Sequence, residues 1–482
     1  MAPLRLFATL NILGATGVAL GAINKCSFPA NRTIQRDVAI IGGGASGAHA
    51  AVLLKEDYGK SIVVVEKQGR LGGHVATHED DNGNTYEYGV QSYLDYGEAL
   101  AFFERFNVTT GTPARVPLTS VYADFSTGLN VTDFVAPAND ARLEALTRFL
   151  EAVAPYEDMI LPGYWNFPAS EDIPEDLLIP FGEFAKKYDL DAAMPQMFQV
   201  PGPGVPDWTE APTLHVIQVF GAPMARALSG QLAGFAPTSH NNTELYGKIG
   251  DLLGDDVLYL STVVETKRDD NGVELVVQSE SGEEYLIVAK KLLVAVEPTV
   301  ETMQPFDLDN DEWAVFEKFD YSTVYAGIVS HPSLPVNVSL VNTVPEAAPA
   351  NYYQFPQGPI LARFDYMGSD SDYFRVLIVG DRDFDEAGAQ ILVRDSIANL
   401  IDGGALPEGD IDDVDYVAFV NHGPMHLRAS VEAIEGGFIQ EQYALQGRRS
   451  TWYTGAAWSV QFTTILWAFN DVLLPKVVED LE

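Results

Sequence analysis

Three glycines early in the chain have the spacing of a phosphate-binding turn. They lie at Gly42-x-Gly44-x-x-Gly47, between an apolar run, DVAIIG, and a helix-like run, ASGAHAAVLLKEDYG. The first glycine permits a tight turn, the second lets the backbone approach a pyrophosphate, and the third lets helix and strand pack closely. The first helical residues, Ala45 and Ser46, then present free N–H groups to the phosphates. The pattern predicts a dinucleotide site.

A carboxylate follows at the spacing that such a site requires. Glu66 ends the next apolar run, SIVVVE, about 20 residues after the glycines, where it can accept hydrogen bonds from both ribose hydroxyls. An acid at this position argues against a 2′-phosphate, and therefore against NADP. A basic turn, KQGRLGGH, follows and contains Lys67, Gly72, Gly73 and His74. The first glycine motif and its acid leave open whether the dinucleotide is a nicotinamide that exchanges or a flavin that stays bound.

Three separated stretches, in the same order, resemble the flavin-containing amine oxidase superfamily. The basic turn resembles its "ER…GGR" signature, which packs along the FAD pyrophosphate, although His74 stands where an arginine is usual. In LSTVVETKRDDNGVELVV, Val263 matches the residue whose backbone holds the adenine. In STWYTGAAWS, Gly455 and Ala456 match the turn that closes on the ribityl phosphate. The resemblance implies bound FAD.

Longer stretches are similar to the fungal β-cyclopiazonate dehydrogenase family. They include LLIPFGEFAKKYDL, APTLHVIQVFG, IEGGFIQEQYALQGRRSTWYTGAAW and ILWAFNDV, and the match runs from about residue 35 to the C-terminus. The resemblance implies an FAD-dependent oxidoreductase that removes a hydride from an apolar small molecule, in a desaturation or oxidative cyclisation of secondary metabolism. A more distant resemblance, to polyenoic fatty acid isomerase, keeps a redox-neutral double-bond isomerase of a fatty-acid-like substrate open. A secreted flavoprotein with a decayed active site is a further alternative.

Two departures from the superfamily bear on the chemistry. Amine oxidases place a lysine near the flavin N5 on a strand that resembles STVYAGIVS, where this chain has Ala326, and no lysine occurs from 319 to 475. The resemblance therefore implies slow reaction of the reduced flavin with dioxygen. Cys26 is the single cysteine, so a cysteinyl link to the flavin is excluded, whereas a histidyl link through His74 stays open. The sequence identifies no catalytic base.

Two histidine pairs and one tryptophan have residue types that could bind a metal or a substrate. His74 and His78, and likewise His422 and His426, have a zinc-like spacing only if they lie on helices, and glycine or proline adjoins each pair. We therefore predict no metal site. Trp458, two residues after the ribityl turn, is a candidate wall of the substrate site, with packing in the core as the alternative.

The elements that position these residues indicate a mixed α/β fold. DVAIIG, the helix after it and SIVVVE form a Rossmann-like unit, and short β-rich runs with hairpin turns follow between 257 and 296. We expect a Rossmann-like FAD-binding domain of the amine oxidase type with an inserted substrate domain. The predicted segments are a signal peptide (1–22), the FAD-binding domain (35–110, 238–300 and 415–482) and the substrate domain (111–237 and 301–414).

Charge and the N-terminus bear on partners and compartment. The 482 residues include 68 acidic and 29 basic ones, a net charge of -39, which disfavours nucleic acid and anionic membranes as partners. The start, MAPLRLFATLNILGATGVALGAINKC, has the layout of a cleaved secretory signal and is too polar and short for stable membrane insertion. We therefore expect a secreted protein or one of the secretory-pathway lumen that acts on a small molecule; the sequence indicates no oligomeric state. Five N-glycosylation sequons agree with secretion: Asn31, Asn107, Asn130, Asn241 and Asn337.

Overall fold

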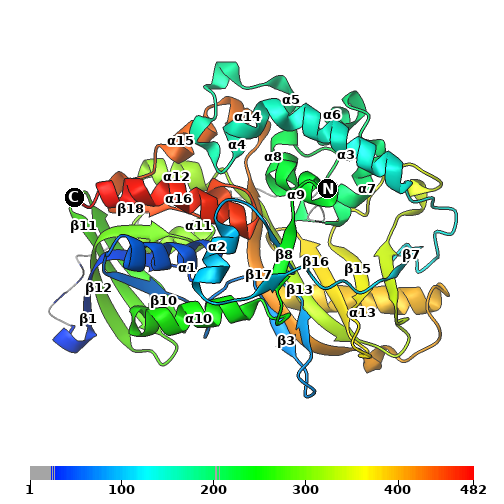
Figure 1. Ribbon diagram of the computed structural model, residues 1–482, viewed down its shortest axis with the longest axis horizontal. Helices are drawn as coiled ribbons and strands as arrows, with labels where there is room; N and C mark the ends of the chain where they lie inside the picture. Colours follow the sequence, from blue (N-terminus) through cyan, green and yellow to red (C-terminus); the bar gives the residue numbers. More distant parts are fainter. Residues whose placement is uncertain (1–22, 24, 26–27, 201–203, 206) are drawn as a thin grey trace, which may run out of the picture.

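The protein is built on two large sheets that lie side by side (Figure 1). The computed structural model describes residues 23, 25, 28–200, 204–205 and 207–482. The predicted signal peptide at 1–22 and Cys26 lie outside the described residues. The fold is the expected mixed α/β architecture, with a seven-stranded and a six-stranded sheet.

The seven-stranded sheet has a parallel centre and an antiparallel edge. The order is β10-β11-β12-β1-β2-β9, and β18 pairs with β12. β1 runs parallel to both β2 and β12, so the carboxyl ends of these strands meet at one edge. The apolar runs of the sequence form the buried centre, because a parallel sheet is covered on both faces. The strands are β1 (Thr33–Ile41), β2 (Ile62–Val65), β9 (Val257–Leu258), β10 (Ser261–Asp269), β11 (Gly272–Ser279), β12 (Glu284–Val294) and β18 (Thr451–Tyr453).

The first and last helices of the described chain pack together on this sheet. α1 (Ala45–Val52) follows β1, and α16 (Thr463–Glu479) returns from the C-terminal end to lie beside it (Figure 1). Asn470 Nδ2 donates a hydrogen bond of 2.8 Å to the Ser46 carbonyl, and Trp467 Nε1 donates one of 3.1 Å to the Ala45 carbonyl. The C-terminal helix therefore holds the start of α1 in place.

A buried ion pair ties the antiparallel edge to the rest of this sheet. The side chains of Arg268 on β10 and Glu312 on α12 (Asn310–Phe316) are 0% and 2% exposed, with Nη1 and Oε1 2.7 Å apart. The Tyr453 hydroxyl donates to Glu312 Oε1 at 2.7 Å, and Arg268 Nη1 donates to the Thr451 hydroxyl at 3.0 Å. Strands β10 and β18, far apart in sequence, are joined through this pair.

The six-stranded sheet carries helix α13 (Glu386–Asp402) on one face and a group of short helices toward the other (Figure 1). Its order is β17-β13-β16-β15-β14-β7. Phe364, Val376 and Ile378 pack with Ala389 and Val393 of α13 in one apolar cluster. The strands are β7 (Thr119–Ala123), β13 (Asp320–Ser330), β14 (Val338–Asn342), β15 (Ile360–Tyr366), β16 (Phe374–Gly380) and β17 (Asp415–Arg428).

Smaller elements complete the fold. There are two small sheets. One is a two-stranded hairpin within the segment that follows the cofactor turn, and the other, of three strands, joins that segment to the residues before α10. No helix in the described ranges is long and apolar enough to cross a membrane. These elements are β3 (Thr77–Glu79), β4 (Thr85–Glu87), β5 (Tyr93–Leu94), β6 (Thr110–Gly111), β8 (Gly234–Pro237), α2 (Ala99–Arg105), α3 (Asn139–Val153), α4 (Glu157–Ile160), α5 (Glu175–Leu178), α6 (Phe181–Lys187), α7 (Met194–Gln199), α8 (Thr213–Val219), α9 (Gly221–Leu228), α10 (Thr243–Leu253), α11 (Val300–Met303), α14 (Val431–Glu435) and α15 (Phe438–Tyr443).

Two of the predicted segment boundaries do not coincide with the sheets. β17 pairs with β13 in the six-stranded sheet along 415–428, so the final cofactor segment does not begin at 415. Conversely, α12 packs on the seven-stranded sheet through Glu312, although it falls in the predicted substrate segment 301–414. Both differences arise because contacts between segments distant in sequence decide which sheet an element joins.

The buried ion pair leads to a prediction about stability. Glu312→Gln removes one charge and leaves the Arg268 guanidinium buried without its counter-charge, so the free energy of unfolding should fall by about 3–5 kcal/mol. Glu301→Gln is the control, because Glu301 is 64% exposed in its ion pair with Arg382 and such pairs contribute about 0–1 kcal/mol. Urea unfolding of the purified variants measures both, and equal losses would show that the buried pair is not a main support.

Candidate active site

The first glycine turn is shaped for close packing on one side and open on the other. A Cβ at Gly47 would lie 1.8 Å from the Gly42 carbonyl oxygen, so α1 can approach β1 only without a side chain there. At Gly44, the nearest atom to an added Cβ is the Gly73 Cα, 3.7 Å away. Gly44 also begins α1 without a side-chain cap, so the N–H groups of the first turn, at Ala45 and Ser46, face this open side.

The Glu66 carboxylate lies at the end of β2, beside this turn. Its Oε2 accepts a hydrogen bond of 2.7 Å from the Gly43 N–H, and its Oε1 accepts one of 2.7 Å from the Gln68 N–H. The side chain is buried, and each carboxylate oxygen keeps a lone pair for a further donor such as a ribose hydroxyl. Lys67, which follows, has an exposed side chain, and, after burial, its charge contributes to lowering the pKa of His74.

The second glycine turn meets the first backbone to backbone. The Gly72 N–H donates to the Gly43 carbonyl at 2.9 Å, and a Cβ at Gly73 would lie 3.0 Å from the Gly44 Cα. Gly72 and Gly73 have φ values of +110° and +55°, which side-chain-bearing residues rarely adopt. The two turns predicted from separate motifs therefore form one surface.

The adenine and ribityl ends predicted from the sequence lie at the same sheet edge. The Ser261 N–H, two residues before Val263 on β10, donates to the Glu66 carbonyl at 3.0 Å. Gly455 follows β18, has a φ of +111°, and a Cβ there would have no atom within 4 Å. Gln218 Nε2 holds the next residue by donating to the Ala456 carbonyl at 3.2 Å. The structure therefore brings both ends of the predicted site to the carboxyl edge of the sheet.

Three histidines converge beyond the second glycine turn. His74 Nε2 lies 2.9 Å from the His422 carbonyl oxygen, and the two rings stack with centroids 4.6 Å apart. Because a carbonyl only accepts, Nε2 of His74 carries the proton. Burial lowers the pKa of His74 and that of His422, and it lowers the pKa of His426 to about 3, so all three imidazoles are neutral at neutral pH.

His422 and His426 were not predicted as site residues. Both lie on β17, which falls in the predicted cofactor segment 415–482, but no local motif marked either histidine. Within the described residues, His422 Nε2 and His426 Nδ1 are buried without a hydrogen-bond partner. No group of three or more potential metal-ligating side chains that could hold an ion is found in the same part of the chain. These two ring nitrogens therefore have hydrogen-bonding capacity that no other described residue satisfies.

Glu297 is a third residue near the site that the sequence analysis missed. It follows Val296, whose Cγ1 would lie 2.7 Å from a Cβ at Gly42, so it is next to the glycine turn. Burial raises its pKa to about 8, and its Oε2 has no partner among the described residues. Glu297 is therefore protonated at neutral pH. In the sequence, the only sign that Glu297 belongs to the site is its position at the end of the KLLVAV run.

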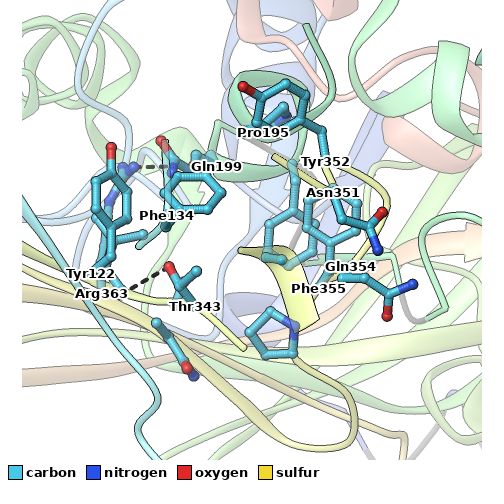
Figure 2. A pocket seen from close by; sticks show the side chains of 16 residues that line it. Tyr122, Phe134, Pro195, Gln199, Thr343, Asn351, Tyr352, Gln354, Phe355 and Arg363 are labelled. Atoms are coloured by element: carbon cyan, nitrogen blue, oxygen red, sulfur yellow. Dashed lines mark hydrogen bonds between the residues drawn. The ribbon is translucent and has the colours of Figure 1, made fainter. Parts of the chain in front are cut away.

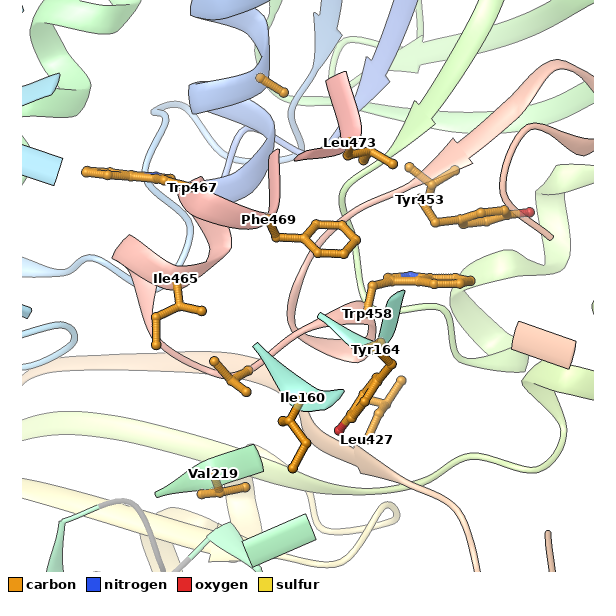
Figure 3. Packing of buried hydrophobic residues seen from close by; sticks show 14 of the residues in the cluster. Ile160, Tyr164, Val219, Leu427, Tyr453, Trp458, Ile465, Trp467, Phe469 and Leu473 are labelled. Atoms are coloured by element: carbon orange, nitrogen blue, oxygen red, sulfur yellow. The ribbon is translucent and has the colours of Figure 1, made fainter. Parts of the chain in front are cut away.

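Trp458 and Ala326 have the surroundings of packed residues. The Trp458 ring is fully buried and stacks on Tyr453 at 4.8 Å, among Tyr164 and Phe469 (Figure 3). Because neither face of the ring is exposed, Trp458 is a packed core residue and not a wall of the substrate site. Ala326 is buried on β13, where it pairs with Val420 on β17, two residues before His422. The position that resembles the N5 lysine site is thus near the histidines.

Comparisons with known proteins agree with this geometry. A family model described as an NAD(P)-binding Rossmann-like domain matches residues 40–106. Beta-cyclopiazonate dehydrogenase of Aspergillus flavus is 32% identical over 463 residues, which are 96% of this chain and 97% of that protein. The FAD-dependent oxidoreductase pigF of Monascus ruber is 33% identical over 483 residues, 98% of this chain and 99% of that one.

Solved structures with the same fold have lower identity. The CLA-producing fatty acid isomerase from P. acnes has a TM-score of 0.69 at 16% identity, covering 92% of this chain and 98% of that one. Wild-type putrescine oxidase bound to putrescine has a TM-score of 0.63 at 16% identity, covering 93% and 100%. The predicted amine oxidase-type fold is confirmed. With full-length relatives above 30% identity, the chain belongs to the family of fungal FAD-dependent oxidoreductases that includes beta-cyclopiazonate dehydrogenase.

Proposed function

We propose that this FAD-dependent oxidoreductase removes a hydride from an apolar small molecule of secondary metabolism, in a desaturation or oxidative cyclisation. The observation that carries the proposal is the meeting of the two glycine turns, with the Glu66 carboxylate at one end and three neutral histidines at the other. The names of the full-length relatives support the metabolic setting.

The residues present fit FAD. The open sides of Gly44 and Gly455 leave room for a pyrophosphate and a ribityl chain, and the free α1 N–H groups suit the phosphates. The lone pairs left on the Glu66 carboxylate suit ribose hydroxyls, and β10, which carries Val263, begins at Ser261 with a hydrogen bond to the Glu66 carbonyl. Bound FAD supplies a hydride acceptor, which the side chains of this protein lack.

The chain's own residues orient the substrate and hold protons. His74 is fixed by its bond to the His422 carbonyl, so its other ring nitrogen, Nδ1, is an acceptor. The unpartnered Nε2 of His422 can accept a hydrogen bond from a donor group of the substrate, because burial keeps this imidazole neutral. Buried Ala326, which pairs with Val420, adds an apolar group beside it.

The redox-neutral isomerase remains the second candidate. The likeness to the P. acnes isomerase, which shows the fold alone, is compatible with it, and so is the absence of a lysine at Ala326. An isomerase needs no external electron acceptor, whereas a dehydrogenase consumes one per turnover. The intact glycine turns and Glu66 contacts argue against a decayed cofactor site.

We propose secretion as the compartment. The support is the pattern of the first 22 residues and the placement of the sequons, since Asn31, Asn107, Asn130 and Asn337 are exposed and Asn241 is half-buried. An N-glycan needs an accessible asparagine, so each of the four exposed positions can accept one.

Cofactor binding is tested by Gly44→Val. A side chain at Gly44 is tolerated by the protein but occupies the open side, so FAD affinity should fall about 100-fold or more, equivalent to about 3 kcal/mol. Gly247→Val on the exposed face of α10 is the control. Titration of the apoproteins with FAD, followed by absorbance, measures both. Acid precipitation should release the FAD; colour retained in the pellet would contradict non-covalent binding and indicate a link through His74.

The electron acceptor is tested with reduced holoprotein. We expect slow reoxidation in air and fast reoxidation by an artificial acceptor such as a quinone. Ala326→Lys should speed the reaction with dioxygen about tenfold or more, because an ammonium stabilises the negative charge that develops on dioxygen, and Ala326→Met is the uncharged control. Rapid peroxide formation by the unmodified protein would make it an oxidase and refute the dehydrogenase proposal.

Secretion is tested by expression in a eukaryotic secretory host. The mature protein should lack residues 1–22, appear in the medium, and decrease in mass on treatment with an endoglycosidase. Peptide sequencing of the N-terminus and intact mass before and after the enzyme provide the measurement. An intact Met1 terminus and no change in mass after the endoglycosidase would contradict the secretion proposal.

A further inference from the structure

A charged cluster lies on the six-stranded sheet, outside the residues assigned so far. Arg363 and Asp365 are on β15, and Arg375 is on β16. Asp365 Oδ2 lies 2.7 Å from Arg363 Nε and 3.0 Å from Arg375 Nη2, and Ser339 Oγ donates to Oδ1 at 2.5 Å. Phe364, between the charged residues of β15, packs with α13, so their side chains lie on the opposite face.

The cluster carries an uncompensated positive charge. Asp365 is 5% exposed. Burial raises the pKa of its carboxyl group, but the charges of Arg363 and Arg375 outweigh this effect, so the net pKa is lowered and Asp365 stays ionised. Two guanidinium groups around one carboxylate leave a net charge of about +1, since arginine remains protonated. The Arg363 and Arg375 side chains are 25% and 22% exposed, so they are partly desolvated, and partial burial of a charge without a counter-ion is costly.

The two guanidinium groups also have spare donors. Beyond Asp365, Arg363 donates to the Gln199 carbonyl at 3.2 Å and Arg375 to the Glu87 carbonyl at a marginal 3.5 Å. These acceptors, in the part of the chain that the structure describes, are fewer than the N–H groups of two guanidinium forks. Such forks match the paired oxygens of a carboxylate.

An aromatic pocket adjoins the cluster. Arg363 is one of its lining residues, and Tyr122, Phe134, Phe198 and Phe355 supply aromatic walls (Figure 2). Pockets that bind small molecules combine an apolar lining with a few convergent polar groups. A guanidinium beside aromatic rings therefore favours a ligand that is both apolar and acidic.

The cluster is within reach of the proposed reaction centre. Arg375 pairs with Ile328 on β13, two residues from Ala326, and Ala326 pairs with Val420 near His422. From β15 to β13 is two strand spacings, about 10 Å. Glu87, whose carbonyl contacts Arg375, belongs to the segment that follows the cofactor turn, which places the guanidinium between the sheet and that segment.

Building on the proposed function, we propose that Arg363 and Arg375 bind an oxyanion, such as a carboxylate, of the apolar substrate. Asp365 orients the two guanidinium groups and moderates their charge. The aromatic pocket takes part of the apolar skeleton, and the oxidisable carbon lies about 10 Å from the oxyanion, toward β13. The substrate class is then an apolar organic acid.

The test measures binding to the oxidised holoprotein by calorimetry, with 4-phenylbutyrate and its neutral isostere 4-phenylbutyramide as probes. The unmodified protein should bind the carboxylate about tenfold or more tightly than the amide, because a hydrogen bond to a charged group is the stronger one. Arg363→Met or Arg375→Met should abolish this preference. The control, Arg394→Met, removes a surface arginine with a 38% exposed side chain on α13 and should leave the preference unchanged.

Asp365→Asn separates ligand binding from a structural role. If Arg363 and Arg375 bind an oxyanion, loss of the Asp365 charge should increase the preference for 4-phenylbutyrate over the amide. If the cluster has only a structural role, Asp365→Asn should lower the stability of the protein without increasing that preference. Equal binding of both probes by the unmodified protein, no saturable binding of either, or a preference that survives both arginine substitutions would overturn the proposal. FAD content, read from the visible absorbance of each sample, shows separately whether the proposed function itself fails.

Discussion

The close approach of α1 to β1 at Gly42 and Gly47 is the constraint on which the site depends. With a Cβ at Gly47 the helix would have to move away from the strand, and the N–H groups of its first turn would no longer point at the second glycine turn. The same helix is held from the other side by Asn470 and Trp467 of α16. A cofactor site that begins near residue 42 is therefore complete only when the C-terminal helix has docked.

The two sheets carry different kinds of buried polar groups. At the cofactor edge, burial keeps Glu297 neutral beside the first glycine turn and keeps His74 and His422 neutral beyond the second. On the six-stranded sheet, Arg363 and Arg375 keep a positive charge inside a strongly acidic protein. This separation suits a substrate whose reacting carbon is apolar and whose recognition group is an anion.

Local sequence patterns predicted the turns that meet at the carboxyl edge of the seven-stranded sheet. The glycine spacing, the acid at Glu66 and the turn at Gly455 each depend on backbone geometry within a few residues, and the structure places them together. The rest depends on contacts between distant segments. β17 looked like part of the cofactor domain because it precedes the final glycine turn, yet it pairs with β13, and this pairing brings His422 to His74.

The same reason explains the other differences. Trp458 follows the ribityl turn closely, but the direction of its ring is decided by Tyr453 and by helix α16 packed around it. The Arg363, Asp365 and Arg375 cluster has no motif, since it joins two strands across a hairpin and faces a pocket built partly from α7. A single sequence shows the spacing of residues within one segment, but it does not show the register in which distant strands pair.

The most direct test of the central claim is a crystal structure of the purified protein with its natural cofactor. We predict FAD across the carboxyl edge of the seven-stranded sheet, with a ribose on Glu66, the pyrophosphate against Gly44 and the α1 N-terminus, and the ring system beside His74 and Ala326. A nicotinamide dinucleotide at the edge, or FAD with its ring system away from the six-stranded sheet, would contradict the account.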